Sequence, residues 1–530
     1  MAGMATAIAT VALLLPASAL AQFTSGVTAG EVTYHSAIVW GRAANPGAVK
    51  AQVATDGSFN NVIRERILQA ESSNDNTVQT KFDSLSPNST FHYRFCLQGG
   101  SSCSAQGKFK TAPPPSLVTP IRFAFSGDET AVSAPGQQQP YWGTFKAFKS
   151  MVAENNKFNI DFGDTIYSDP EVPGAATALT VGEKWAMYRK KLAIPNMRSI
   201  RAATGIYNHW DDHEFINDFS IPENGRGLYD RGVRAFRTYM PVTFSNERGI
   251  YRSFRWGKNL ELFFLDERSF RSAKASANHA CDNPDTGQPD LAPTAPQSTR
   301  NFFSALVPSL SNPVSQACKD AINSRNHTFL GGPQLNRFID AVTNSTANWK
   351  VVMNETPIQQ FYALPYDRWE GYAVERVRLL HALQNANVDH LAFLTTDTHA
   401  ALANVVRYRT LDNDVAPSNA PLAAPSGHYQ GMSASDFEAQ KLRDRSAIAS
   451  EALSELSRLS GYRPQAVENR GEQSLTRRTP QATPGLDAAP ESTTPVPHRE
   501  RNATDVRSML SGFRAGVERG RADQGRDADD

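Results

Sequence analysis

The segment FNIDFGDTIY at residues 158–167 decides the fold, because an apolar run ends there in a group of polar side chains. The run at 158–162 predicts a buried β-strand, and Asp164 and Tyr167 follow its carboxyl end. Four other segments have the same form. They are 121–125 before SGDE at 126–129, 206–210 before DDHE at 211–214, 349–353 before Asn354, and 390–395 before TDTH at 396–399. Because strand ends of this kind meet at one edge of an α/β fold, a shared site is expected there.

From residue 121 onward, apolar β-rich runs alternate with helical stretches, which indicates α/β organisation. A further strand is predicted at 260–265, and helices are predicted at 142–155, 333–342 and 371–384. Residues 272–328 form a long polar insertion. Residues 23–112 instead alternate in short runs separated by turn residues, which predicts a small all-β sandwich. Prolines at 113–115 make a stiff linker to the second domain, which is expected to span 113–425.

Composition sets limits on the class of protein. The 530 residues are 40% hydrophobic and carry 54 basic and 53 acidic side chains, so a large core is possible and the net charge is only +1. A nucleic-acid or membrane-surface partner normally requires a basic excess, which this chain lacks. We therefore expect no nucleic-acid partner. The chain is also expected to be a monomer.

Residues 1–22 resemble an export signal, with an apolar run at 5–15 and the small-x-small pattern at 19–21. The run is too short to span a bilayer, so the mature chain is expected to be secreted or periplasmic, without a membrane span. No basic residue precedes the run, which leaves a start further upstream open, and a buried N-terminal helix is the alternative interpretation.

Four cysteines in an exported chain fit two disulfides. The pairs nearest in sequence are Cys96 with Cys103 and Cys281 with Cys318, although sequence alone leaves the connectivity open. A metal–thiolate site is the weaker interpretation, because none of the four lies in a CxxC motif.

The C-terminal segment has a different composition from the rest of the chain. Residues 426–530 are rich in Ala, Arg, Pro, Ser, Gln and Gly, which predicts a low-complexity, disordered tail with one amphipathic helix at 437–459. One hypothesis is that the gene is read out of frame from about this point, and a natural disordered tail is the alternative. The other two reading frames would decide between them.

The side chains at the strand ends are mostly hard oxygen donors. Such donors suit Fe(III), Mn, Ca or Zn, and a pair of cations suits phosphoryl transfer because it can hold the attacking and leaving oxygens in line. A lone aspartate after a strand is more often a turn former or helix cap, and His209 is more often a structural histidine than a ligand. His213 is different, because Asp212 and Glu214 flank it and would raise its basicity and orient its ring.

Several longer motifs carry a specific resemblance. They are GDTIY at 163–167, WDDHE at 210–214, LDERSFR at 265–271, WKVVMNETP at 349–357, DRWEGYAVER at 367–376 and TDTHAALA at 396–403. Over residues 23–408 the chain resembles the alkaline phosphatase D (PhoD-like) group of metallophosphoesterases. The resemblance implies a four-layer αββα sandwich, preceded by a small sandwich of the fibronectin III or immunoglobulin type.

The resemblance also implies a site. Asp164 would bridge two metal ions and Tyr167 would be a phenolate ligand. The remaining metal ligands would be Asp128, Asp212, Asn354, Asp397 and His399. The catalytic residues would be His213, Asp212 and Arg268. His213 would protonate the leaving group or bind the phosphoryl oxygens, and Arg268 with Arg271 would clamp phosphate. Two or more ions are expected, Fe or Ca or both, with Mn or Zn as alternatives.

Three features depart from the group's pattern. Asp128 stands where many members have a cysteine, which predicts a harder metal centre, and Thr396 stands where a glycine is usual. The twin-arginine export signal typical of the group is absent from this sequence.

The expected reaction is hydrolysis of small phosphate monoesters or diesters by a metal-bound hydroxide, because cations lower the pKa of a bound water. One rival is a non-catalytic secreted binding protein with a degenerate or C-terminally truncated phosphoesterase domain. A third interpretation is a hydrolase of another ester class that uses the same centre.

Overall fold

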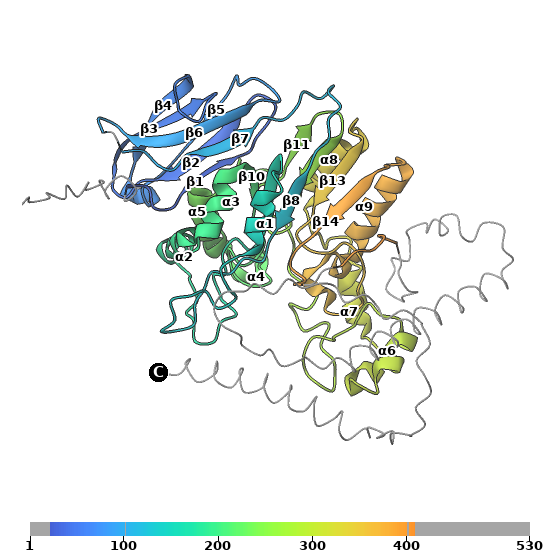
Figure 1. Ribbon diagram of the computed structural model, residues 1–530. Helices are drawn as coiled ribbons and strands as arrows, with labels where there is room; N and C mark the ends of the chain where they lie inside the picture. Colours follow the sequence, from blue (N-terminus) through green and yellow to red (C-terminus); the bar gives the residue numbers. More distant parts are fainter. Residues whose placement is uncertain (1–21, 101, 400–401, 409–530) are drawn as a thin grey trace, which may run out of the picture. The chain divides into compact units, whose positions relative to one another are not determined.

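The computed structural model describes residues 22–100, 102–399 and 402–408 (Figure 1). Residues 1–21 of the predicted export signal lie outside this part of the chain, as do the predicted tail at 426–530 and its helix at 437–459. Among the described residues, no helix has both the length and the apolar character needed to cross a membrane.

Residues 27–110 form the predicted all-β sandwich, with a three-stranded and a four-stranded antiparallel sheet. The first sheet has the order β1 (Val27–Gly30), β2 (Ala37–Arg42), β5 (Thr77–Phe82), and the second has the order β4 (Val62–Ala70), β3 (Gly47–Ala54), β6 (Thr90–Leu97), β7 (Gly107–Lys110). Side chains of β5 alternate between buried and exposed, as a sheet with one face on a core requires. The predicted disulfide between Cys96 and Cys103 is confirmed.

Two further sheets build the second domain. One is fully parallel, in the order β10 (Gly205–His209), β9 (Phe158–Phe162), β8 (Phe123–Ser126). The other has the order β11 (Arg252–Trp256), β12 (Leu260–Phe264), β13 (Trp349–Met353), β14 (Leu391–Leu394), in which only β11 is antiparallel to its neighbour. Every strand predicted in this domain is therefore present, within two residues of its expected bounds.

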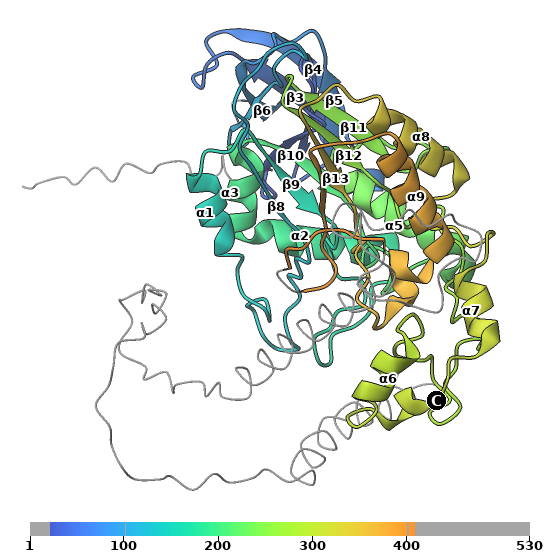
Figure 2. The same ribbon diagram turned by 90° about the vertical axis from the view of Figure 1, so that its right-hand side faces the viewer.

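The two sheets pack face to face, with helices outside both, which confirms the predicted αββα sandwich. Phe162 on β9 and Phe264 on β12 belong to the core between the sheets, with ring centroids 6.4 Å apart. The helices outside β8–β10 are α1 (Ala147–Ala153), α2 (Val181–Ala193), α3 (Pro195–Ala203) and α5 (Arg226–Tyr239), and those outside β11–β14 are α8 (Gly332–Thr343) and α9 (Ala373–Asn385). Figure 2 shows α1 and α3 on one side of the strands and α8 and α9 on the other.

Shorter elements complete the described chain. The helix predicted at 142–155 begins only at Ala147, because Gly143 and Phe145 take left-handed backbone angles (φ 107° and 54°) that interrupt it. The insertion at 272–328 is stapled by the predicted Cys281–Cys318 disulfide. The remaining helical segments are η2 (Ser72–Asn74), α4 (Ile221–Asn224), α6 (Gln297–Phe303), η3 (Pro308–Ser311), α7 (Gln316–Ile322), η4 (Pro365–Asp367) and η5 (Trp369–Gly371).

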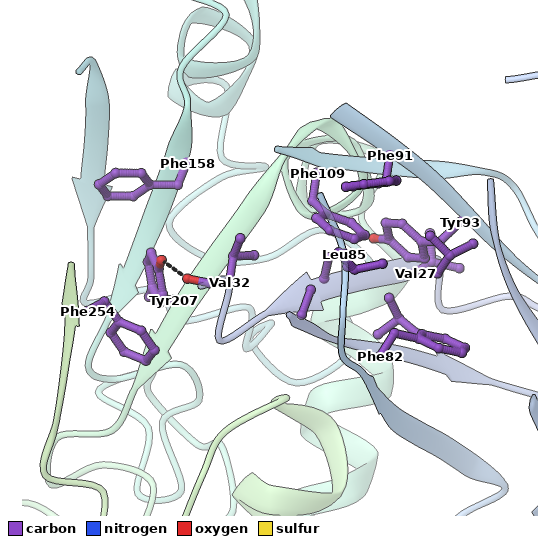
Figure 3. Packing of buried hydrophobic residues seen from close by; sticks show 14 of the residues in the cluster. Val27, Val32, Phe82, Leu85, Phe91, Tyr93, Phe109, Phe158, Tyr207 and Phe254 are labelled. Carbon is purple, nitrogen blue, oxygen red and sulfur yellow. Dashed lines mark hydrogen bonds between the residues drawn. The ribbon is translucent and has the colours of Figure 1, made fainter. Parts of the chain in front are cut away.

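The sandwich packs directly on the parallel sheet, and side chains of both domains belong to one hydrophobic cluster (Figure 3). The buried hydroxyl of Tyr207 on β10 donates to the carbonyl of Val32 at 2.5 Å and accepts from the indole nitrogen of Trp256 at 2.8 Å. Gly205 leaves room for this contact, because a Cβ there would lie 2.8 Å from a methyl group of Val32. The sandwich and β10 are therefore fixed to each other by polar as well as apolar contacts.

Substituting Tyr207→Phe should lower the free energy of unfolding by about 1–3 kcal/mol, because it leaves a buried carbonyl and a buried indole N–H without a partner. Chemical denaturation followed by tryptophan fluorescence would measure the loss. Tyr34→Phe is the matched control, since the Tyr34 ring is 41% exposed. An equal change in both variants would contradict the role assigned to the Tyr207 hydroxyl.

Candidate metal centre

Four of the predicted ligands have unusual backbone angles at the strand ends. Asp128, Asp164, Asp397 and His399 have φ values of 57°, 50°, 68° and 50°. Residues other than glycine rarely adopt this left-handed region, and such strain persists where the surrounding structure enforces it, often at functional sites. The strand-end loops are therefore built to direct these side chains.

Hydrogen bonds join the loops that follow β8, β9 and β14. The Asp128 carboxylate accepts the backbone N–H of Asp397 at 3.0 Å and lies 3.5 Å from the Nε2 atom of His399. The same His399 nitrogen is 3.2 Å from the Tyr167 hydroxyl, and the backbone of Glu129 donates to the carbonyl of Asp164. Strand ends from both sheets of the domain thus meet at one place.

The acidic and histidine side chains there form overlapping groups, each with ligand atoms within 4.8 Å of one another. The groups are Asp128 with Asp164 and His399; Asp164 with Asp212 and His213; Asp211 with Asp212 and Asp397; and Asp212 with Asp218 and Asp367. Asp164 belongs to two groups and Asp212 to three. The groups therefore form one continuous array, which we call the acidic array.

The electrostatic environment of the acidic array favours the binding of positive charge. Burial raises the pKa of Asp164 well above its usual value, and the nearby carboxylates of Asp212 and Asp211 raise it further. Burial and Asp212 also raise the pKa of Asp397, despite the opposing effect of Arg268. Buried oxygens of Asp211 and Asp212 have no hydrogen-bond partner among the described residues. Carboxylate oxygens are common ligands of cations in proteins, so these buried oxygens without hydrogen-bond partners are suited to binding cations.

His213 is held beside the array by two contacts. Its Nδ1 atom lies 2.7 Å from the Asp169 carboxylate, and its ring stacks on Tyr167 with centroids 4.2 Å apart. Burial alone would lower the pKa of His213, but the Asp169 hydrogen bond and the Asp212 charge raise it to about 9. The side chain that orients the ring is therefore Asp169, which corrects the expectation that Asp212 and Glu214 do so, while the charges of both raise the pKa of His213 as expected.

Glu214 instead ties two of the loops together. One carboxylate oxygen accepts from the backbone and hydroxyl of Thr165, both at 2.5 Å, and the other accepts from the backbone N–H of Asp211 at 2.9 Å. Because Thr165 follows Asp164 directly, this carboxylate fixes the loops after β9 and β10 relative to each other.

Arg268 lies inside the protein and balances charge. Its guanidinium group is 2.6 Å from Asp211 and 2.7 Å from Asp367, and its side chain has no exposed surface. Arg271 is likewise buried, 2.6 Å from Asp367. Phosphate clamping by these arginines stays a prediction, since the structure shows both of them paired with carboxylates.

A buried polar chain connects the sandwich to this site. Glu31 pairs with Arg252 at 2.8 Å, and Arg252 lies 3.2 Å from the Nδ1 atom of His209. The other nitrogen of His209 is 2.8 Å from Glu355, which lies 3.7 Å from Arg268. His209 is therefore a satisfied structural histidine, as expected.

Two models of protein families match the chain. Residues 130–480, more than half of the chain, match the model of the PhoD-like phosphatase family, and residues 9–113 match the model of its N-terminal domain. The chain belongs to the PhoD-like phosphatase family. The resemblance seen in the motifs is thereby confirmed, and the family match extends past residue 425, where the second domain was expected to end.

Among curated relatives of this PhoD-like chain is alkaline phosphatase D of Bacillus subtilis (strain 168), which is 26% identical over an alignment of 427 positions that covers 72% of the chain. The chain spans 65% of that relative's length. A solved structure of PhoD matches with a TM-score of 0.59 and 24% identity over 73% of each chain, which supports the fold. A purple acid phosphatase from yellow lupin (Lupinus luteus) seeds has a TM-score of 0.42 and 13% identity, over 69% of this chain and 57% of that one.

Asn354 lies at the end of β13, where it was predicted. Its amide oxygen accepts from the indole nitrogen of Trp369 at 2.7 Å, and its amide nitrogen donates to the carbonyl of Thr356. Both contacts hold the amide in one orientation, and its role as a metal ligand stays a prediction.

Sequence reasoning missed three acidic residues of this PhoD-like site: Asp169, Asp218 and Asp367. Asp367 is the first residue of the DRWEG motif, so the sequence offered a signal that it belongs to the site. Asp169 and Asp218 lie in loops beyond the motifs, and no local pattern distinguishes them from surface aspartates.

Removing cations from the purified protein with a chelator should lower its thermal unfolding midpoint, because the carboxylates of the acidic array would then repel one another without compensation. Restoring cation at about 100 times its Kd should recover about 2–3 kcal/mol of stability. Differential scanning calorimetry with added Ca, Mn, Fe or Zn would show this. A midpoint that no added cation shifts would contradict metal binding at the array.

Proposed function

We propose that this chain is a metal-dependent phosphoesterase, which hydrolyses small phosphate monoesters or diesters at a centre of two or more cations. The observation that carries the proposal is the acidic array, where buried carboxylates from both sheets converge with unpartnered oxygens. Membership of the PhoD-like phosphatase family supports the same reaction class.

The residues present would hold cations in two overlapping sets. Asp164 groups with Asp128 and His399, which Tyr167 contacts, and it also groups with Asp212, which in turn groups with Asp397. Such cations would neutralise the phosphate and lower the pKa of a water molecule. Oxygen donors of this kind favour Fe or Ca, with Mn or Zn as alternatives.

His213 is the proposed proton donor to the leaving oxygen. Asp169 holds its Nδ1 atom, so Nε2 is the ring nitrogen left to face a phosphate ester. Stacking on Tyr167 fixes the plane of the ring beside Asp164 and Asp212. A positioned acid of this type typically contributes about 10²–10⁴-fold to the rate.

Arg268 would act through the carboxylates that it contacts. Its pairing with Asp211, and its position 3.9 Å from Asp212 and 4.0 Å from Asp397, hold these groups together before cations bind. The two disulfides suit an oxidising compartment, which supports a secreted or periplasmic location.

Substituting Asp164→Asn should abolish metal loading and activity together, because Asp164 belongs to both donor groups on either side of it. His213→Ala should leave metal content unchanged and lower kcat by about 10²–10⁴-fold. Metal analysis and assays of a chromogenic phosphate ester with added Ca, Fe, Mn or Zn would check both.

Asp285→Asn and His279→Ala are matched controls on the exposed surface of the insertion. Full activity of the Asp164 variant with unchanged metal content would defeat the assignment. A wild-type chain that binds metals but hydrolyses no phosphate ester would favour the non-catalytic binding protein.

Substituting Asp169→Ala should lower kcat by about 10–100-fold with unchanged metal content, because the His213 ring loses the partner that orients it. Asp169→Asn should recover part of the rate, since its amide oxygen can still accept from Nδ1. Steady-state kinetics with the same ester would measure both variants, and an Asn variant slower than the Ala variant would contradict the orienting role.

A further inference from the structure

A groove separate from the acidic array lies between the sandwich and helix α5. It encloses about 560 Å³, and none of the proposed metal ligands lines it. Strands β4 and β5 with the turn between them supply one wall, and α5 supplies the other. Clefts between domains are common ligand sites in proteins.

The α5 wall of the groove is positively charged. Arg226, Arg234 and Arg237 line it, and Asp230 is the one acidic side chain in the lining. Arg226 pairs with Asp230 at 3.0 Å. Arg234 donates to the carbonyl of Ser73, and Arg237 lies over the ring of Phe244.

Among the described residues, neither Arg234 nor Arg237 has a carboxylate within 4.0 Å, so two positive charges in the groove remain without an acidic partner. The whole chain has a net charge of only +1, which makes this local excess notable. Anions are therefore the ligands that the groove would attract.

Guanidinium groups extend along the groove: the unpaired Arg234 and Arg237 are one helical turn apart, and Arg226, which pairs with Asp230, lies further along α5. Arg226 and Arg237 are eleven residues apart on one helix, which corresponds to roughly 16 Å at 1.5 Å per residue. The facing wall offers the carboxamides of Gln69 and Asn74 as hydrogen-bond donors. A single small anion would occupy only part of such a site, whereas an extended anion would contact its whole length.

The groove is preformed, because partly buried contacts fix its two walls. Asp75, in the turn between β4 and β5, accepts from Arg42 of the sandwich, from Arg189 of α2 at 2.5 Å, and from the hydroxyl of Tyr239 on α5. A rigid site loses less entropy when a ligand binds.

We propose that this groove is a second binding site, which takes an extended ligand with phosphate groups along its length. Guanidinium groups bind phosphate oxygens by paired, charge-assisted hydrogen bonds. The choice of phosphate over another anion rests on the proposed function, since the chain would then hold a phosphate-bearing substrate at a place remote from the acidic array. The existence of an anion site rests on the groove alone.

The experiment measures binding of a linear inorganic polyphosphate, and of orthophosphate for comparison, by isothermal titration calorimetry on the metal-loaded chain. Wild type should bind polyphosphate saturably and orthophosphate far more weakly. Arg234→Ala combined with Arg237→Ala should weaken polyphosphate binding by about tenfold or more. Thermal unfolding would verify that this exposed double variant is folded.

Two further variants locate the binding. Arg64→Ala with Arg378→Ala makes the same charge change at exposed sites outside the groove, and it should bind as wild type does. Asp164→Asn should also retain polyphosphate binding, because it alters only the acidic array. Retained binding there with lost esterase activity would separate this site from the proposed function.

Three outcomes would overturn the proposal. They are no saturable binding by wild type, an equal loss in the groove pair and the control pair, and a loss in Asp164→Asn with none in the groove pair. The last outcome would assign the polyphosphate to the acidic array, and the second would indicate non-specific attraction.

Discussion

Repulsion between buried carboxylates is the constraint on which the rest of this structure depends. Asp164, Asp211 and Asp212 are buried close to one another, with the partly buried Asp397 beside them, so their negative charges oppose the fold. Arg268 offsets part of this repulsion, and cations would offset the remainder. The left-handed residues at the strand ends, and the hydrogen bonds of Glu214, keep the loops in place against it.

The features of the fold and site that could be predicted from the sequence are those that have a local sequence signal. A strand followed closely by an aspartate is a local pattern, so β9 with Asp164 and β10 with Asp212 were recognisable. The order of the runs indicated α/β organisation, and the αββα architecture came from the resemblance to the PhoD-like group. The late start of α1 was only partly recognisable, because Gly143 is a residue that favours a positive φ, whereas the left-handed angle at Phe145 has no sequence signature.

The roles of charged residues were harder to predict, because they depend on distant segments. Asp169 is 44 residues from the histidine that it orients, and Asp367 is 99 residues from Arg268. Arg268 was expected to face phosphate, yet the structure surrounds it with acidic groups from three loops. Glu214 was favoured as a partner of His213 because the two are adjacent in the sequence. Neighbouring side chains in a loop, however, often point in different directions.

The polar chain from Glu31 through Arg252, His209 and Glu355 to Arg268 has a consequence for how the two domains can be separated. A fragment that starts at the proline linker would lack Glu31, so the Arg252 cation would lose its carboxylate partner. Arg252 lies beside His209, which contacts Glu355. The small sandwich thus completes the polar surroundings of Arg252, and we expect the second domain to be less stable without it.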